Sequence, residues 1–173
     1  MANYRKEFSK IYDKYINKIY RFIFLKVNSQ EIAQDLTSET FLKGWEAFQK
    51  ANNPGNSIQK IENPQAFLYQ IARNLVIDHY REKSKAQLVS VEFSPIIDPR
   101  QNLEERANLN SDLEEIKRGL VKIKDEYQDV IIYRYLNELS MPEIAKIMDK
   151  SEGTVRVLLH RALKSLKDEV NLD

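Results

Sequence analysis

The stretch SMPEIAKIMDKSEGTVRVLLHRALKSLK, residues 140–167, has the pattern of two short helices joined by a tight turn. Ser140 and Glu143 have the spacing of a capping box at the start of the first helix. Ala145 is small enough to let a second helix cross closely. Ser151 is a suitable N-cap for that second helix. This spacing predicts a helix-turn-helix.

The second helix of this stretch has two distinct faces. At 100° per residue, one arc is apolar and is expected to face the core: Val155, Leu158, Leu159, Ala162, Leu163 and Leu166. The opposite arc is basic, with Val157 among Arg156, His160, Arg161, Lys164 and Lys167. A basic face can neutralise phosphates while its first residues reach base edges in a major groove. The alternative is a solvated cationic face, but an exposed Val157 suits a thymine methyl better than water.

The composition excludes several other kinds of chemistry. Among 173 residues there is no cysteine and there are two histidines, so disulfides, thiolate nucleophiles and sulfur-ligated metals are excluded and a histidine-rich metal site is not expected. The net charge of +1 does not indicate a partner. The first residues lack an apolar signal core, and no apolar run is long enough to span a membrane. We therefore expect a cytoplasmic protein without a cofactor.

Three further helices are predicted upstream. Residues 4–26 carry an apolar face at steps of three and four: Phe8, Ile11, Tyr12, Tyr15, Ile19, Phe22 and Ile23. A second helix is expected from Asn28 or Ser29, where Asn28 and Glu31 have capping-box spacing, to about residue 50. A loop rich in Asn, Pro and Gly follows. Asn63-Pro64 then gives an N-cap and first-turn proline for a third helix to about residue 83.

The helical pattern lapses between residues 84 and 111, where SVEFSPIIDPR carries two prolines. Helical signals resume at Asp112 and continue to the C-terminus. The sequence therefore predicts an all-α protein of two small helical domains, 1–83 and 112–173, joined by a flexible linker, 84–111. The second domain contains the helix-turn-helix.

Residues 140–167 closely resemble region four of the sigma-70 family of transcription-initiation factors, in its compact group-four or extracytoplasmic-function (ECF) form. The upstream half resembles region two in three motifs: YDKYINKIYRFIFLKV, AQDLTSETFLKGW and NPQAFLYQIARNLVIDHYRE. The resemblance implies a factor that is not an enzyme. It would bind core RNA polymerase and promoter DNA, open the strands and leave the chemistry to the polymerase. The resemblance is also compatible with an anti-sigma protein as a partner.

In this family the second helix of region two binds the clamp helices of the largest polymerase subunit. The resemblance places the following residues at that contact: Asp35, Leu36, Glu39, Thr40 and Phe41. For Leu36 and Phe41, simple core packing is an equal alternative.

The third helix and the loop before it bind the non-template strand of the minus-ten element in proteins of this family. There an extruded base can be stacked and hydrogen-bonded. The matching residues are Asn74, Asp78 and Arg81, with the loop residues Asn52, Asn53 and Asn56 as candidates for choosing the base. Arg73 can pair either with a phosphate or with an acidic neighbour in the fold. Tyr69 and Tyr80 can stack on bases, although core packing is the simpler reading.

Region four reads the minus-thirty-five element, as a duplex, in proteins of this family. The corresponding candidates are Ser151, Thr154, Arg156, Val157, His160, Arg161 and Lys164. Ser151 and Thr154 suit phosphates at a helix N-terminus. Two departures are visible: Val157 and Leu158 stand where many relatives are polar or basic, and Asp149 stands where the turn often has Gly. Asp tolerates a left-handed backbone, so the turn is expected to survive.

Two other classes of protein remain as alternatives. A stand-alone DNA-binding regulator would carry a receiver or ligand-binding domain upstream, and the upstream half shows no strand pattern. A nuclease or recombinase would use carboxylates, and Asp35 and Glu39 share a helix face. No nucleophile or catalytic motif accompanies that pair.

Overall fold

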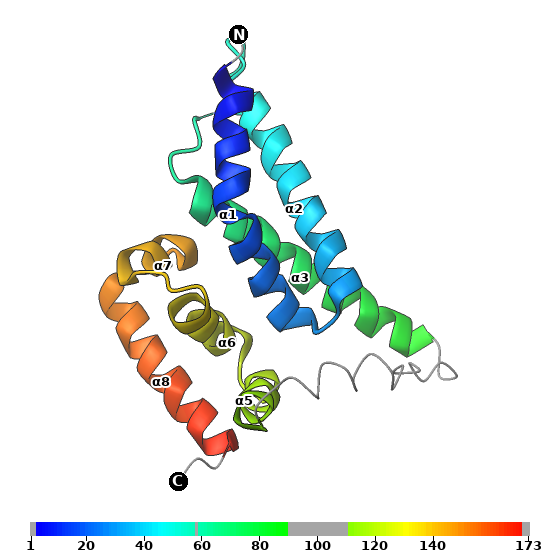
Figure 1. Ribbon diagram of the computed structural model, residues 1–173, viewed down its shortest axis with the longest axis vertical. Helices are drawn as coiled ribbons and strands as arrows, with labels where there is room; N and C mark the ends of the chain where they lie inside the picture. Colours follow the sequence, from blue (N-terminus) through cyan, green and yellow to red (C-terminus); the bar gives the residue numbers. More distant parts are fainter. Residues whose placement is uncertain (1–2, 58, 90–110, 171–173) are drawn as a thin grey trace.

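The computed structural model describes residues 3–57, 59–89 and 111–170, and every regular element in these ranges is helical. The N-terminal half contains α1 (Asn3–Val27), α2 (Gln30–Ala51) and α3 (Pro64–Val89). The C-terminal half contains α5 (Ser111–Lys122), α6 (Asp125–Ile131), the π-helical turn η1 (Ile132–Leu136), α7 (Met141–Met148) and α8 (Glu152–Val170). The prediction of an all-α fold with a C-terminal helix-turn-helix is confirmed (Figure 1).

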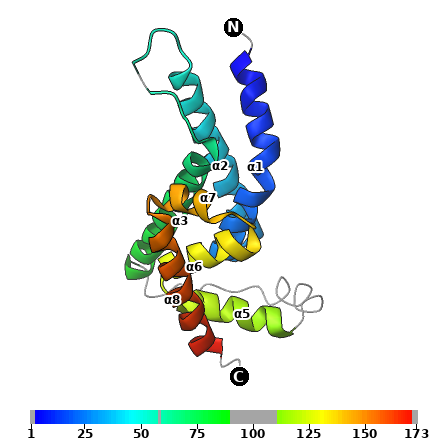
Figure 2. The same cartoon turned by 90° about the vertical axis from the view of Figure 1, so that its left-hand side faces the viewer.

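In the N-terminal half, α1 and α2 run side by side and α3 packs against both (Figures 1 and 2). The apolar face predicted for α1 supplies the core, since Ile19, Phe22 and Ile23 are completely buried. Tyr12 is an exception within that face. Its side chain is 43% exposed and meets the ring of Phe41 edge-on.

The N-caps of α2 and α3 lie where the sequence predicted them, although the capping-box spacing of Asn28 with Glu31 is not the one used. Ser29, not Asn28, is the N-cap of α2: its side chain accepts a hydrogen bond from the backbone N–H of Ile32, and Asn28 has a left-handed φ of 51°. The predicted cap of α3 is confirmed, because Asn63 Oδ1 accepts from the N–H of Ala66 at 3.0 Å.

Helix α3 also continues past its expected end near residue 83, so the first residues of the predicted linker are helical. Residues 90–110, the remainder of that linker, lie outside the described part of the chain.

The C-terminal half packs α5 and α6 against α8. Gly119 of α5 allows this closeness, because a Cβ atom there would lie 2.4 Å from the side chain of Val170. The predicted apolar face of α8 is largely buried. Leu163 is the correction: it is 37% exposed, because it lies at the margin of the face that meets α5, α6 and α7.

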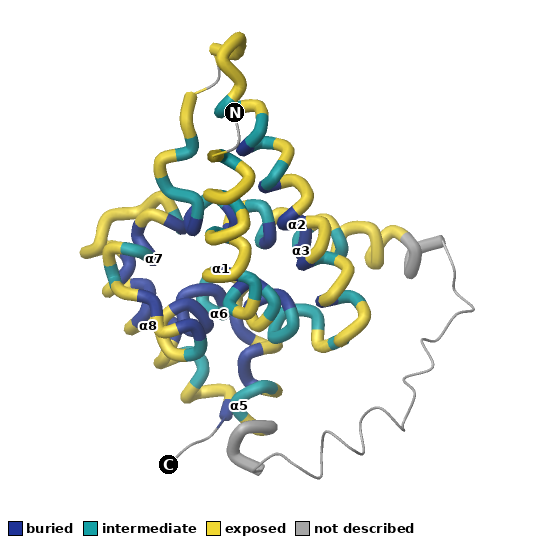
Figure 3. Tube along the Cα trace, turned by 45° about the horizontal axis from the view of Figure 1, so that its top comes forward, coloured by how far each residue is buried: buried dark blue, intermediate teal, exposed yellow. Residues whose placement is uncertain are grey.

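The two halves are in contact, which the sequence did not predict. Helix α7 lies against α3, and η1 approaches α1. Figure 3 shows many buried residues in α6, α7 and the first half of α3, while the loop after α2 is largely exposed. No helix in the described ranges is both long and apolar enough to cross a membrane.

Candidate nucleic-acid interface

The helix-turn-helix of α7 and α8 has the capping box, the turn and the second N-cap that its sequence predicted. Ser140 and Glu143 form a reciprocal capping box, with Ser140 N donating to Glu143 Oε2 at 2.8 Å. Asp149 adopts the left-handed conformation at the end of α7, with φ 53° and ψ 49°. The Lys150 N–H then donates to the Ala145 carbonyl at 3.0 Å, which satisfies one of the last carbonyls of α7. The turn therefore keeps its geometry without glycine.

Helix α8 presents a basic strip to solvent. Its candidate residues are all exposed: Ser151, Thr154, Arg156, Val157, His160, Arg161 and Lys164. Val157 is 50% exposed within this strip. By contrast, Val155, Leu158 and Leu159 on the other face are buried. Burial of one face fixes the orientation of the helix, so the cations must point outward.

The N-terminus of α8 is already capped from within the chain. Ser151 Oγ accepts from the Thr154 N–H at 3.2 Å, and the two hydroxyl groups lie 2.8 Å apart. Arg156 pairs with Glu152 at 3.5 Å across one turn, and both side chains are well exposed. Exposed pairs of this kind are weak, so Arg156 can exchange Glu152 for a phosphate at little cost.

The candidate polymerase-binding residues of α2 range from exposed to buried. Asp35 and Glu39 are exposed, and Glu39 makes an exposed ion pair with Lys43 at 3.5 Å. Leu36 is partly buried. Thr40 and Phe41 are buried, and Thr40 Oγ1 donates to the Leu36 carbonyl at 2.7 Å. The solvent-facing part of this set is therefore acidic.

Leu42 adds an apolar residue to this acidic surface. It follows Glu39 by three positions and is 57% exposed. Leu42 was not selected from the sequence, because apolar residues of an amphipathic helix are usually assigned to the core. A helical wheel would have shown that Leu42 lies one turn from Glu39, on the same side of α2.

The loop candidates after α2 cap the helix that precedes them. Asn52 Nδ2 donates to the Phe48 carbonyl at 2.8 Å, and Asn56 Nδ2 donates to the Lys50 carbonyl at 3.3 Å. The side chain of Asn53 is exposed. Among the described residues, the side-chain amide of Asn53 makes no hydrogen bond within the chain, unlike those of Asn52 and Asn56.

The α3 candidates form an exposed line at helical spacing. Asn74, Asp78 and Arg81 are all exposed, and Asp78 and Arg81 form a long, exposed ion pair at 3.9 Å. Arg73 does not belong to this line. Its Nε atom lies 2.7 Å from Oδ2 of Asp129 in the C-terminal half. Of the two alternatives that the sequence left open for Arg73, the acidic neighbour is the one present here.

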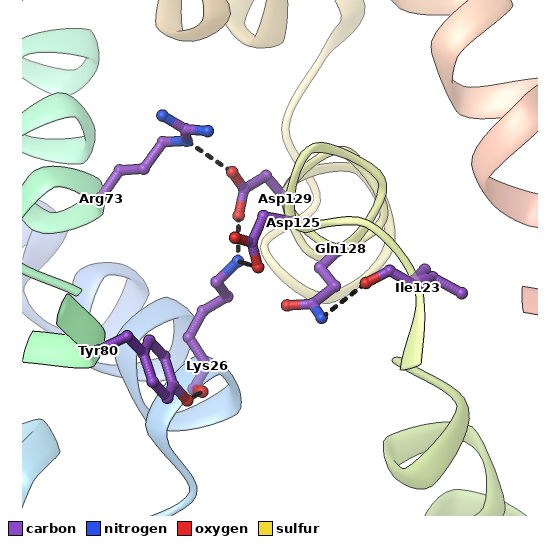
Figure 4. A network of polar contacts seen from close by, with 7 residues as sticks. All are labelled: Lys26, Arg73, Tyr80, Ile123, Asp125, Gln128 and Asp129. Carbon is purple, nitrogen blue, oxygen red and sulfur yellow. Dashed lines mark hydrogen bonds and ion pairs between the residues drawn. The ribbon is translucent and has the colours of Figure 1, made fainter. Parts of the chain in front are cut away.

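Asp129 is the centre of a polar network between the halves (Figure 4). It is completely buried, and its second oxygen, Oδ1, lies 2.8 Å from the Lys26 ammonium. Burial by itself would lower the pKa of the Arg73 guanidinium, but the hydrogen bond and charge of Asp129 outweigh it and raise that pKa. The network was missed in the sequence because its members are far apart along the chain.

The two tyrosines considered for base stacking lie in different surroundings. Tyr69 is completely buried, and burial raises its pKa well above the ordinary value, against the lowering effect of its hydrogen bond with Asn137. Tyr80 is 41% exposed, and its hydroxyl donates to the Lys26 carbonyl. Burial is also the main cause that raises the Tyr80 pKa.

A cleft of about 540 Å³ lies beside this network, between α3 and the first helices of the C-terminal half. Tyr80, Arg81 and Lys85 border it on α3, and Val121 and Gln128 border it on α5 and α6. No group of His, Cys, Asp or Glu in the described ranges is arranged to hold a metal ion.

An all-helical chain with a complete helix-turn-helix and an exposed basic recognition helix defines the class of DNA-binding proteins that act on duplex DNA. The comparisons then specify the family. Residues 11–86 match sigma-70 region 2, and residues 113–166 match sigma-70 region 4. The chain belongs to the sigma-70 family of RNA polymerase sigma factors, in the ECF group.

Two curated relatives support this assignment over nearly the whole chain. The ECF RNA polymerase sigma factor BldN of Streptomyces coelicolor is 32% identical over 164 residues, which are 92% of this chain and 58% of that protein. The RNA polymerase sigma factor YlaC of Bacillus subtilis is 30% identical over 170 residues, covering 95% of this chain and 92% of that protein.

Among solved structures, the sigma factor RpoE in complex with the anti-sigma factor NepR, from Bartonella quintana, has a similar fold. Its TM-score is 0.68 at 20% identity, and the match covers 97% of this chain and 99% of that one.

Proposed function

We propose that this chain acts as a sigma factor through three separate surfaces. Residues 1–83 form the polymerase-binding and minus-ten module, residues 84–111 connect it, and residues 112–173 form the minus-thirty-five module. The observation that carries the proposal is the basic strip of α8, which a complete helix-turn-helix holds facing solvent. Such a strip binds duplex DNA by phosphate neutralisation and base contacts.

The minus-thirty-five module reads DNA through the N-terminal half of α8. Val157 supplies an apolar contact suited to a thymine methyl, and Arg161 and Lys164 supply positive charge. The N-terminus of α8 also favours a phosphate by its dipole. These residues share one exposed face, as a groove-binding helix requires.

The polymerase-binding module uses the exposed face of α2. Asp35 and Glu39 supply negative charge, and Leu42 supplies exposed apolar area. Thr40 and Phe41 support that face from inside the bundle, because their side chains are buried. The partner surface on the polymerase would accordingly be basic with an apolar centre.

The minus-ten surface follows the exposed line of α3. Asn74 and Asp78 can hydrogen-bond the pairing edge of an extruded base, and Arg81 can contact a phosphate. Asn53 in the preceding loop is exposed and has its amide available for base selection. The chain contributes recognition and strand capture, and the polymerase performs the chemistry. A protein with these partners would work in the cytoplasm, where an anti-sigma protein is a further partner that we propose.

Run-off transcription on genomic fragments tests the proposal. Purified core polymerase is assayed with and without this chain, and start sites are mapped by sequencing the transcripts. The expected result is a new, shared pair of upstream elements at the start sites that depend on the chain. A chain that failed to bind core polymerase, or left start-site choice unchanged, would refute it.

A gel shift with the chain alone addresses the stand-alone regulator. The near-neutral net charge predicts weak promoter binding without polymerase, because nonspecific affinity depends on phosphate neutralisation. Tight and specific binding by the chain alone would favour the regulator instead.

A further inference from the structure

The cleft beside α3 has apolar walls of the size that a small molecule requires. Its volume of about 540 Å³ lies within the range of roughly 300–1,000 Å³ that is usual for ligand pockets. The walls come from α1, α3, α5 and η1, and their apolar residues in the described part of the chain are Leu25, Val76, Ile77, Leu120, Val121 and Ile132. Such walls favour a ligand with an apolar body.

Two side chains at the cleft still present apolar area to solvent. Val121 on α5 is 73% exposed, and Tyr80 on α3 is 41% exposed. The Tyr80 hydroxyl donates to the Lys26 carbonyl, so the ring is held at the edge of the cleft (Figure 4). An apolar ligand would remove this area from water, which is favourable.

The charges at the cleft are unequal in sign. The described lining contains more cations than acids: Lys26, Arg73, Arg81 and Lys85 against Asp125 and Asp129. Asp129 pairs with both Lys26 and Arg73. The lining therefore carries a net positive charge, which favours an anion.

Arg81 and Lys85 are the two cations that remain available to a ligand. They lie four positions apart, so they are neighbours on one side of α3, directly after Ile77 on the same line. Arg81 has a long, exposed ion pair with Asp78 at 3.9 Å, and Lys85 has no ion pair within the described part of the chain. Like charges at this spacing repel each other, and an anion between them would remove that repulsion.

The uncharged polar groups of the described lining are few and partly occupied. They are Tyr80, Ser84 and Gln128. Gln128 Nε2 donates to the Ile123 carbonyl, and the Tyr80 hydroxyl is used as described above. A sugar or a nucleotide would leave many of its own polar groups without partners here. A ligand with one anionic head and an apolar chain matches the lining better.

We propose that this cleft binds a single-chain carboxylate, such as a free fatty acid, with its head at Arg81 and Lys85 and its chain between the walls of α3 and α5. Neither promoter recognition nor polymerase binding requires such a site, so the inference goes beyond the proposed function. Its test needs only the purified full chain. The result is therefore independent of whether the chain redirects transcription.

Isothermal titration calorimetry with three compounds tests the proposal. Decanoate has both parts of the proposed ligand, acetate has the head alone, and decyltrimethylammonium joins the same chain to a positive charge. We expect decanoate, kept below its micelle-forming concentration, to bind at one molecule per chain. The other two should bind at least about tenfold more weakly, because each lacks one of the two contacts.

Lys85→Gln removes charge from the head site without altering the minus-ten surface, to which Arg81 also belongs. Lys85 is exposed, so the fold should persist. We expect the affinity for decanoate to fall by about three- to tenfold, and Lys85→Arg to retain it. The matched control is Lys83→Gln, which removes a charge from an exposed residue of α3 that does not line the cleft. It should leave the affinity unchanged.

Val121→Asp tests the opposite wall of the cleft. It places an acid on α5 where the apolar chain of the ligand would lie, so decanoate binding should be lost. Val121 is exposed, and circular dichroism verifies that the variant remains helical. Loss of binding from both walls would locate the ligand between them, whereas unchanged binding in this variant would overturn the proposal.

The other outcomes are equally decisive. The proposal fails if decanoate does not bind, if acetate binds as tightly, which would indicate an adventitious anion only, or if decyltrimethylammonium binds as tightly, which would indicate nonspecific apolar contact. An equal loss in Lys83→Gln and Lys85→Gln would assign the effect to overall charge and overturn it as well. Binding to phosphatidylglycerol vesicles without binding of soluble decanoate would identify a membrane surface instead, which also contradicts the proposal.

Discussion

The Nε atom of Arg73 in α3 lies 2.7 Å from Oδ2 of Asp129 in α6, fifty-six positions away in the sequence. The side chain of Arg73 is 40% exposed, whereas that of Asp129 is 1% exposed. Arg73 is therefore the accessible member, positioned at the edge of the contact between the halves. It can exchange its protein partner for a phosphate, whereas Asp129 depends on remaining covered.

Arg161→Ala tests the basic strip of α8. Arg161 is exposed, so the substitution should leave folding intact. Loss of one phosphate contact should weaken promoter binding by the polymerase complex and reduce the salt slope of log K by about 1. Filter binding across a salt series measures both. Lys122→Ala, an equal loss of charge on the exposed side of α5, should change neither.

Asp35→Asn and Phe41→Ala distinguish binding from packing on α2. Asp35 is exposed, so its substitution should weaken association with core polymerase without affecting stability. Phe41 is 5% exposed and contacts Tyr12, so its truncation should destabilise the fold by about 3–5 kcal/mol. Urea unfolding and polymerase pull-down are measured on both. The assignment is wrong if Phe41→Ala is as stable as the wild type.

Asp149→Gly should stabilise the helix-turn-helix. Asp149 has a φ of 53°, which glycine adopts without the steric cost of a Cβ atom. We expect a gain of about 0.5–1 kcal/mol in the free energy of unfolding. Asp149→Val should lose at least roughly 1 kcal/mol, because a β-branched residue fits this conformation worst. Thermal and urea denaturation give both values, and a gain with valine would contradict the argument.

Alkaline pH should weaken the fold through its buried tyrosines. Burial, followed by the charge of Asp129, raises the pKa of Tyr133, and burial raises that of Tyr69. A tyrosine whose pKa is higher in the folded than in the unfolded protein adds to the free energy of unfolding. This contribution is complete below the unfolded pKa of about 10 and is lost as the pH rises from there through the folded-state pKa. Urea unfolding at increasing pH should show the decline, and tyrosinate absorbance should lag behind that of unfolded chain.

Phenylalanine substitutions at the two tyrosines separate their roles. The Tyr133 hydroxyl is buried with no hydrogen-bond partner among the described residues, so Tyr133→Phe should be neutral or stabilising at neutral pH. Tyr69→Phe removes the acceptor of the Asn137 amide and should cost about 0.5–1.5 kcal/mol. The double variant should lose most of the alkaline decline. A decline that persisted unchanged would assign it to other groups.

The candidate site was only partly visible in the sequence. The line of Asn74, Asp78 and Arg81 was found from family motifs, and its exposure follows from helical spacing. Leu42 was missed, although the helical wheel places it one turn from the exposed Glu39. For Arg73 the sequence offered a phosphate or an acid, and it could not decide, since Asp129 lies in a separate module.

The helices, their caps and the orientation of the helix-turn-helix were determined by the sequence itself. Helical periodicity and capping depend on residues three or four positions apart, so Ser140 with Glu143 and the buried face of α8 are properties of local chain. The contact of Asp129 with Lys26 and Arg73, and the burial of Tyr133 between Phe22 and Tyr69, were decided only by the tertiary structure. Those residues meet because two amphipathic modules pack together, and no local pattern specifies which charged or aromatic side chains the packing will cover.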